Sequence, residues 1–249
     1  MVLGDGGIIS QARLAMQMWE NASTEEEQSL NELLEEYEQA MNKLTAPIIT
    51  ISGTEGNNDY YTSKVTVTIE AEEGTKATKL IYSVTGAEEI EETTVEETSI
   101  SFTINEDGTS IVSAYLANEN YTSDASTQSV SIDVTAPEVT LAVDSYDTET
   151  ITVTATGTDE TSGIYSYEFQ ISTDNSTWTT TETEESTEET CSYTYSNLED
   201  GTEYYIRAIA TDNAGNTATS EVAEEETEPD KLYLYYYGDT MNENSGRMD

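Results

Sequence analysis

The stretch NLEDGTEYYIRAIATDNAGN, residues 197–216, decides how this chain is interpreted. Between its two turn-forming ends, the side chains fall into two alternating sets from residue 204 to residue 210. An alternation with a period of two predicts a β-strand with two different faces. One face carries Tyr204, Ile206, Ala208 and Ala210, and the other carries Tyr205, Arg207 and Ile209.

Turn-forming residues lie on both sides of this strand. Gly201 precedes it, and residues 212–216 follow it with side chains that tolerate the left-handed backbone of a hairpin. The spacing from Leu198 to Tyr204 resembles that of fibronectin type III and bacterial immunoglobulin-like surface domains. The resemblance implies a β-sandwich with a tyrosine corner, in which the Tyr204 hydroxyl forms a hydrogen bond with the preceding turn. Such modules bind, space and display, so the fold alone does not identify the function.

A tripeptide repeat divides the chain. Thr45-Ala46-Pro47 returns ninety residues later as Thr135-Ala136-Pro137, and a short β-branched run follows each copy. A fixed period indicates one module per repeat, and proline is tolerated at the start of an edge strand. We therefore predict a mainly β fold, with two tandem immunoglobulin-like β-sandwiches preceded by an amphipathic N-terminal α-helix. The predicted segments are a helix in 1–45, domain 1 in 46–134, a fibronectin type III-like domain 2 in 135–223, and an acidic linker with a Tyr-rich strand in 224–249.

Domain 1 shows the same alternation in five segments. At the position of the corner tyrosine it offers Ser110 or Ile111, so we expect no tyrosine corner there. The acidic residues 88–97, and residues 179–190 of domain 2, are too polar for core strands and are predicted as loops or sheet edges. The alternating positions are Val65, Val67 and Ile69; Leu80, Tyr82 and Val84; Ile100, Phe102 and Ile104; Val112, Ala114 and Leu116; and Val130, Ile132 and Val134.

The charge of the chain limits its partners. It carries 51 acidic and 8 basic residues, a formal net charge of −43. A surface this negative repels nucleic acid phosphates and anionic lipid headgroups, so neither is an expected partner. No apolar run in the sequence is long enough to span a membrane. We expect membrane attachment only through a segment upstream of this sequence.

Composition also argues against catalysis. There is no histidine, and Cys191 is the only cysteine, so thiolate or imidazole metal sites are excluded. The sequence contains no nucleophile elbow and no phosphate-binding glycine loop. The many carboxylates lie in Thr- and Glu-rich loops, where contact with water keeps their pKa values similar. Acid and base catalysis requires two groups whose pKa values differ. The protein is therefore predicted not to be an enzyme.

Oxygen-rich loops favour one cofactor, calcium. Asp133 precedes the second Thr-Ala-Pro, and Asp159, Glu160 and Asp212 lie in loops that a sandwich gathers at one end. Oxygen ligands from carboxylates and carbonyl groups suit calcium, although no calcium-loop motif occurs. A solvated acidic rim without an ion is the alternative interpretation, and the prediction otherwise includes no cofactor.

The N-terminal region carries an apolar stripe with helical spacing. We expect this stripe either to pack on its own sandwich or to meet other copies of the chain. Residues 3–15, followed by a Glu-rich helix, resemble type IV pilin-like proteins of Gram-positive bacteria just after their hydrophobic helix. The resemblance implies assembly into an extracellular filament. The stripe consists of Ile8, Ala12, Ala15 and Trp19, then Leu30, Leu34, Tyr37 and Met41 after a shift of one residue.

Two other features suggest contacts. Trp178 follows a predicted hairpin and either covers the edge of the core or stacks on a glycan. In the tail, Leu232, Leu234 and Tyr236 share one face of a strand that is apolar on both sides. Such a strand is expected to pair with a sheet, either of its own domain or of a neighbouring copy.

These observations predict a non-enzymatic, extracellular structural subunit of a bacterial filament or surface appendage. The predicted partner is the chain itself, in a homopolymer. The alternative is an adhesin or a phage virion decoration protein that uses the same modules to bind cell-surface glycans or host proteins.

Overall fold

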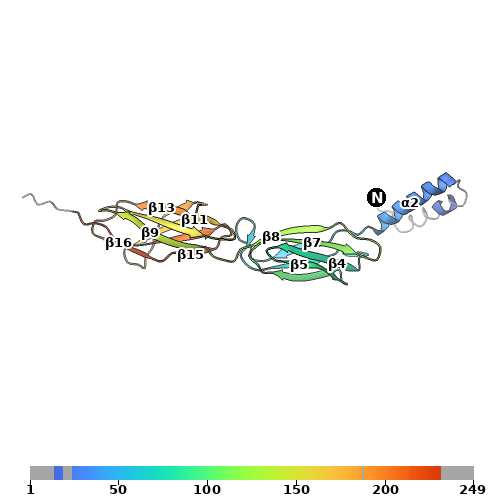
Figure 1. The fold of residues 1–249 in the computed structure, drawn as a ribbon, viewed down its shortest axis with the longest axis horizontal. Helices are drawn as coiled ribbons and strands as arrows, with labels where there is room; N and C mark the ends of the chain where they lie inside the picture. Colours follow the sequence, from blue (N-terminus) through green and yellow to red (C-terminus); the bar gives the residue numbers. More distant parts are fainter. Residues whose placement is uncertain (1–13, 19–23, 187, 231–249) are drawn as a thin grey trace, which may run out of the picture. The chain divides into compact units, whose positions relative to one another are not determined.

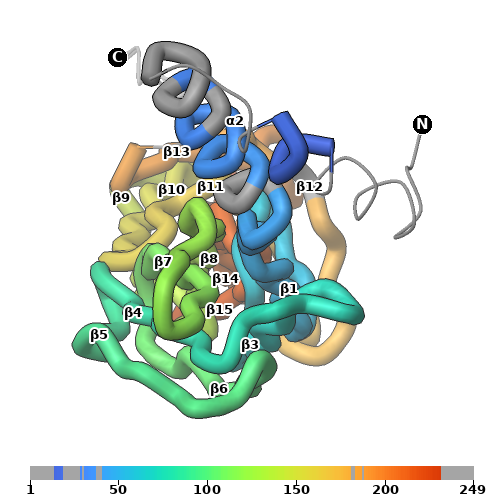
Figure 2. The backbone as a smooth tube through the Cα atoms, turned by 90° about the vertical axis from the view of Figure 1, so that its right-hand side faces the viewer, coloured from blue at the N-terminus to red at the C-terminus, as the bar shows by residue number. Residues whose placement is uncertain are grey.

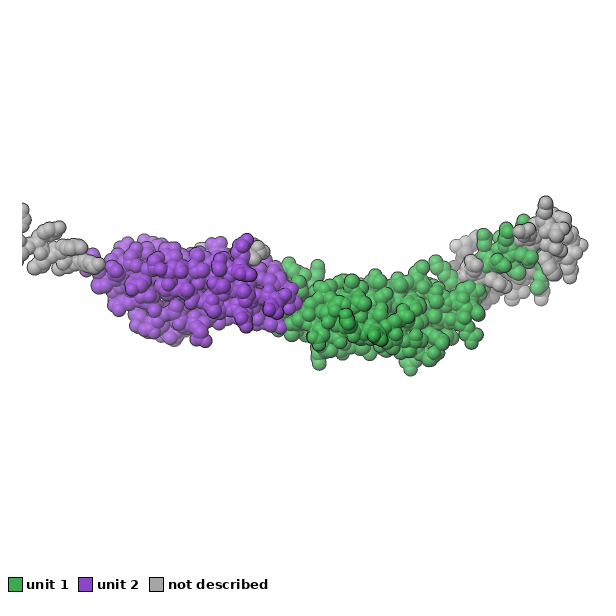
Figure 3. All heavy atoms as spheres, in the orientation of Figure 1, with its two compact units in different colours: residues 1–134 green, residues 135–249 purple. Residues whose placement is uncertain are grey.

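The computed structural model describes residues 14–18, 24–186 and 188–230. These residues form two compact units, residues 1–134 (unit 1) and residues 135–249 (unit 2), which Figure 3 shows in different colours. Most of the described chain is β-strand, and its helical part lies near the N-terminus (Figure 1). The flanks predicted as 1–45 and 224–249 are not separated from the two units by this division.

Unit 1 is a β-sandwich of a three-stranded and a five-stranded sheet (Figures 1 and 2). The strand orders are β1-β3-β6 and β2-β8-β7-β4-β5. All pairs are antiparallel except β2 with β8. The elements are α2 (Thr24–Asn42), β1 (Ile48–Ser52), β2 (Tyr60–Tyr61), β3 (Val65–Glu70), β4 (Lys79–Gly86), β5 (Ile90–Val95), β6 (Ser99–Ile104), β7 (Gly108–Ala117) and β8 (Ser126–Ile132).

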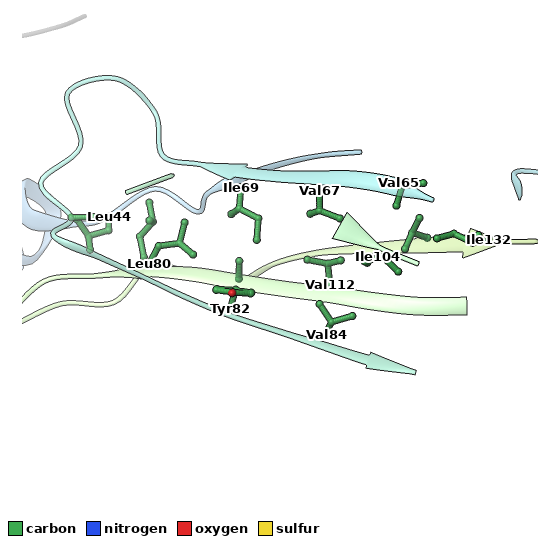
Figure 4. Packing of buried hydrophobic residues seen from close by; sticks show 14 residues of the cluster. Leu44, Val65, Val67, Ile69, Leu80, Tyr82, Val84, Ile104, Val112 and Ile132 are labelled. Atoms are coloured by element: carbon green, nitrogen blue, oxygen red, sulfur yellow. The ribbon is translucent and has the colours of Figure 1, made fainter. Parts of the chain in front are cut away.

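The core of unit 1 fills the space between its sheets, as Figure 4 shows. Val65, Val67 and Ile69 of β3 face Leu80 and Val84 of β4 across the interior. The residues between them in β3 are exposed or half-buried, so the predicted alternation matches the burial pattern of β3. Burial of a Val, Leu or Ile side chain contributes roughly 1.5–3 kcal/mol, so this apolar layer is a main source of the unit's stability.

Unit 2 is a sandwich of the same kind. One sheet has the order β13-β10-β9, and the other has the order β12-β11-β14, with both β15 and β16 paired to β14. All pairs in unit 2 are antiparallel. The strands are β9 (Glu138–Tyr146), β10 (Ile151–Thr158), β11 (Ile164–Ser172), β12 (Thr179–Glu185), β13 (Thr190–Tyr195), β14 (Glu203–Asp212), β15 (Thr217–Thr219) and β16 (Ala223–Glu226).

The two prolines of the repeat come immediately before edge strands. Pro47 precedes β1, and Pro137 precedes β9, each at the edge of a three-stranded sheet. Both prolines are buried. Because proline has no N–H to donate, the start of an edge strand is where its presence costs least.

The acidic segments of both units form sheet edges. Residues 90–95 form β5 and residues 179–185 form β12, the outermost strands of the larger sheets. The sequence left two interpretations open for these segments, a loop or an edge strand. The structure shows an edge strand in both units. Their carboxylates disfavour pairing with a further chain on that side.

The predicted linker from residue 224 is wrong in its first residues. Residues 223–226 form β16, paired with the start of β14 in the register Glu203 to Glu226 and Ile206 to Ala223. This strand has only one apolar residue, so hydrophobic alternation could not reveal it. Backbone pairing and the buried Thr227 that follows determine its position.

Candidate functional site

Helix α2 carries the apolar surface that the sequence assigned to assembly. Leu33, Leu34, Tyr37 and Met41 are 56%, 46%, 39% and 43% exposed. Exposed large apolar groups that lie together on one element are typical of interaction surfaces. We call Leu33, Leu34, Tyr37 and Met41 the α2 face. Leu30 lies in the same helix, and Leu33 is an addition that the predicted stripe did not include.

The C-terminal end of α2 is fixed to unit 1. Leu44, which continues the helical spacing, is buried in the core of that unit. The Lys76 ammonium donates to the Met41 carbonyl at 2.8 Å and to the Asn42 side-chain oxygen at 3.5 Å. A cation at the C-terminus of a helix interacts favourably with the helix dipole and with the last carbonyl groups. The α2 face is thus presented by a helix whose end is held in place.

Several of the predicted assembly residues cannot be placed. Ile8, Ala12 and Trp19, and Leu232, Leu234 and Tyr236 of the tail, lie outside the described residues. Ala15 lies in a described helical stretch, residues 14–18, and is half-buried. Their roles stay predictions.

The tyrosine-corner residues of unit 2 meet at the turn before β14. The Glu199 N–H donates to the Tyr204 hydroxyl oxygen at 2.9 Å, and the Tyr204 ring is buried. Leu198 packs against the core cluster of the same unit. Ser110 occupies the corresponding end of β7 in unit 1, where its hydroxyl accepts from the Glu88 N–H at 3.0 Å.

Thr227 holds the same turn from the other side. Its buried hydroxyl accepts from the Thr202 N–H at 3.0 Å and donates to the Glu199 carbonyl at 2.6 Å. The turn is therefore bonded both to the strand that follows it and to the chain after β16. The sequence contained no periodic signal for this contact, because 25 residues separate Thr202 from Thr227.

We expect Tyr204→Phe to destabilise unit 2 by about 1 kcal/mol, because the Glu199 N–H loses its acceptor while the ring keeps its packing. Chemical denaturation followed by tyrosine fluorescence measures the change. The matched control is Tyr205→Phe, whose hydroxyl donates to Glu203 Oε2 on the exposed face and should matter less. An equal loss in both variants would contradict a specific role for the corner.

The loop residues proposed for calcium are already engaged with protein donors. Asp159 Oδ1 accepts from the backbone N–H groups of Thr161, Ser162 and Gly163 at 3.1, 2.7 and 2.9 Å. Glu160, beside it, is exposed. A carboxylate that accepts several backbone N–H bonds organises its own turn, so Asp159 has a structural role without an ion.

Asp212 plays the same part in the turn after β14. Its Oδ1 accepts from the N–H groups of Gly215 and Asn216 at 2.7 and 2.9 Å, and its Oδ2 accepts from Asn216 Nδ2 at 2.9 Å. The carboxylate is fully buried, and one of its oxygens lies within 4.8 Å of one oxygen of Asp159. Calcium at this pair stays a prediction, and an ion there would compete with these donors.

Asn213 joins the two acidic loops of unit 2. Its side-chain amide donates to the carbonyl groups of residues 162–164 at 2.9, 3.1 and 3.2 Å. Asp133, the fourth predicted ligand, belongs to unit 1, where it is buried and its N–H donates to the Tyr61 carbonyl at 2.9 Å. Within unit 2, the fold brings together Asp159 and Asp212.

Trp178 does not cover the core edge. The Arg207 guanidinium carbon lies 4.1 Å from the centre of its ring, and Arg207 Nε donates to Gln170 Oε1 at 2.6 Å. Arg207 alternates with the buried Ile206 and Ala208, so this contact lies on the outer face of the sheet. The sequence could not show it, because it depends on the pairing of strands that are distant in the chain. One face of the indole is occupied by a cation, which leaves less of the ring for a glycan.

A shallow hollow of about 480 Å³ lies in unit 1 beside the hairpin that precedes β3. Asn58 and Asp59 have φ values of 50° and 63°, and the Tyr60 N–H donates to the Asn57 carbonyl at 3.0 Å. Two successive positive φ values with this bond are the geometry of a type I′ hairpin turn. The hollow is lined by Glu55, Gly56, Asp59, Tyr60, Tyr61, Gln128 and Ser129.

Within the described ranges, no helix combines the length and the hydropathy that crossing a bilayer requires.

No protein-family model and no curated protein matches the sequence. Solved structures with a similar fold include the FN1–FN3 domains of chicken CNTN1, at 17% identity and a TM-score of 0.34, covering 75% of this chain and 68% of that one. A segment of two fibronectin type III domains from chicken tenascin has 14% identity and a TM-score of 0.34, covering 72% and 97%. The fibronectin type III domain of human fibronectin type III domain containing protein 3 has 24% identity and a TM-score of 0.31, covering 38% and 86%. All three contain fibronectin type III modules, and the β-sandwich assignment here rests on the strand order of each unit.

Proposed function

We propose that this chain is a non-enzymatic structural subunit of an extracellular filament or surface appendage. It self-associates through α2 and displays two β-sandwich units. The observation that carries the proposal is the α2 face, four large apolar side chains that are each between 39% and 56% exposed on a helix whose end is fixed. Leaving such a surface in water is costly, at about 25 cal/mol for each Å² of apolar area.

The charge of the chain supports a restricted contact of this kind. With a net charge of −43, two copies repel one another over most of their surfaces. An apolar face on a helix outside the sandwiches allows contact while the acidic sandwiches stay apart. The pilin-like resemblance of residues 3–15 supports the same arrangement, and an extracellular location follows from the proposed role.

A filament needs a second contact, and the C-terminal segment supplies the candidate. Residues 231–237 read as a strand that is apolar on both faces. Just before this segment, Thr227 is buried and the Asp230 N–H donates to Asp200 Oδ2 at 3.1 Å. The chain is therefore attached to unit 2 up to residue 230. In this proposal the segment pairs with a sheet edge of a neighbouring copy.

The adhesin alternative depends on an exposed aromatic surface for glycans. Trp178 was considered for glycan stacking, and its contact with Arg207 favours a structural role for the indole. The structural-subunit proposal therefore has the stronger support.

We expect Leu34→Ser combined with Met41→Ser to weaken self-association at least tenfold, because both changes remove exposed apolar area from the α2 face without altering charge. Sedimentation velocity over a range of protein concentrations measures the association constant. The matched control is Glu35→Gln, which changes a helix residue outside the apolar spacing. Equal association of the double variant and the wild type would show that another surface joins the copies.

A further inference from the structure

The spacing of α2 has the form of a two-helix contact. Residues 30, 34, 37 and 41 are separated by steps of four, three and four, which places them at positions d, a, d and a of a heptad repeat. The flanking e and g positions between them are Asn31, Leu33, Glu38 and Ala40. Only one of these four carries a charge, so a second helix can approach the seam closely.

Three of the glutamates of this stretch lie away from the seam. Glu32, Glu35 and Glu36 take positions f, b and c, which point away from a partner helix. Between residues 30 and 41, Glu38 is the one carboxylate that flanks the seam, so this part of the helix is compatible with a second copy of the same helix.

The two ends of α2 differ in charge. The sequence of its first turn includes Glu25, Glu26 and Glu27. At its other end, Lys76 donates to the last turn and Lys43 follows the helix directly. The Lys43 ammonium lies 3.9 Å from Asp124 Oδ2 in an exposed pair, which contributes little and leaves it able to meet another carboxylate.

This asymmetry distinguishes the two ways in which helices of two copies can pair. A parallel pair places the three N-terminal glutamates of one copy beside the same three of the other, and like charges so placed repel. An antiparallel pair places them beside Lys43 and Lys76 of the other copy. The helix dipoles are also opposed in the antiparallel pair, which favours it further.

The positions of the sandwiches favour the same orientation. Because Leu44 is buried in unit 1, each copy of that acidic unit lies at the C-terminal end of its own helix. In the antiparallel register the two Leu44 residues are about 25 Å apart along the helix axis, at 1.5 Å per residue. That distance is about three Debye lengths at physiological ionic strength, so repulsion between the two units is screened. A parallel pair would bring them side by side.

We propose that α2 pairs with α2 of a second copy in antiparallel orientation. The twofold axis passes between Glu35 and Glu36, so that Leu30 lies opposite Met41 of the other copy and Leu34 lies opposite Tyr37. This inference rests on the proposed self-association and specifies its geometry. A twofold contact closes on itself, so growth beyond a pair requires the separate C-terminal contact.

Disulfide trapping in the full-length chain tests the orientation. Leu30→Cys and Met41→Cys are each made in a Cys191→Ser background, and one of the two proteins carries a polyhistidine tag so that a mixed dimer has its own mobility on a gel. Both are oxidised with oxidised glutathione, alone and as a mixture. A disulfide forms only where Cα atoms approach to about 4.4–6.8 Å. Glu32→Cys, at an outward position, is the control.

The antiparallel pair predicts that most of the cross-linked product is the mixed dimer, with little dimer from either variant alone. Strong cross-linking of each variant with itself would overturn the antiparallel geometry and leave self-association through α2 intact. Absence of cross-links together with monomers in sedimentation would overturn both. Association that appears only after residues 1–23 are removed would show that the chain's own N-terminal segment occupies the face, which also overturns the proposal.

Discussion

Phe169→Ala is expected to destabilise unit 2 by about 3–5 kcal/mol. The side chain is fully buried among the core residues of the unit, and its ring stacks on Tyr193 with centroids 5.4 Å apart. Truncation removes the apolar area and leaves a cavity between two sheets that are fixed by their hydrogen bonds, so the site cannot collapse fully. A domain's whole stability is about 5–15 kcal/mol, so the loss is a large part of it.

Differential scanning calorimetry measures the change and also tests whether the units unfold separately. We expect the transition of unit 2 to move to lower temperature while that of unit 1 stays in place. The control is Tyr165→Phe on the exposed face of the same strand, which removes only the exposed hydrogen bond from its hydroxyl to Glu185 and should cost no more than about 1 kcal/mol. A single transition that moves as a whole would contradict independent units divided near residue 135.

Asp212→Ala is expected to cost unit 2 about 3 kcal/mol, because the N–H groups of Gly215 and Asn216 lose a charged acceptor at a buried site. Asp212→Asn should cost less, since an amide oxygen can still accept from those N–H groups. Thermal unfolding measured with calcium and with a chelator distinguishes a role of Asp212 in the turn from a role in binding an ion. If Asp212→Ala loses the same stability in both solutions, the carboxylate acts through the turn. A wild-type protein that calcium stabilises, beside an Asp212→Ala variant that it does not, would establish the metal site instead.

Strands with apolar alternation could be predicted from the sequence. Residues 65–69, 80–84 and 204–210 all lie in strands with the expected face buried, because hydrophobic burial determines which side turns inward. The predicted strand ending at Val134 stops at Ile132, since Asp133 already belongs to the connection between the units.

Contacts between side chains distant in sequence could not be predicted. Lys76 reaches the end of α2 from 35 residues away, and Thr227 reaches the turn before β14 from the far side of β16. Arg207 of β14 contacts Trp178, which lies in the connection between β11 and β12, and alternation alone does not bring these two residues together. Such contacts depend on tertiary structure, and the order of apolar and polar residues along the chain does not predict them.

The α2 face was predicted in part. The spacing of Leu34, Tyr37 and Met41 indicated a helical stripe, while the alternatives of packing on its own sandwich or meeting another copy stayed open. The structure bears on the first alternative only, and contact with another copy stays a prediction. Leu44 packs into unit 1, and the residues before it are exposed. The stripe passes from exposed to buried between Met41 and Leu44, where the chain enters the sandwich.

Sedimentation velocity of the full chain beside a chain lacking residues 1–43 tests the central claim of self-association through the helix most directly. The deletion keeps Leu44 and both sandwiches, so circular dichroism should show the β-structure unchanged. We expect the full chain to associate as its concentration rises, and the shortened chain to sediment as a monomer at every concentration. A shortened chain that associates as strongly as the full chain would contradict the account.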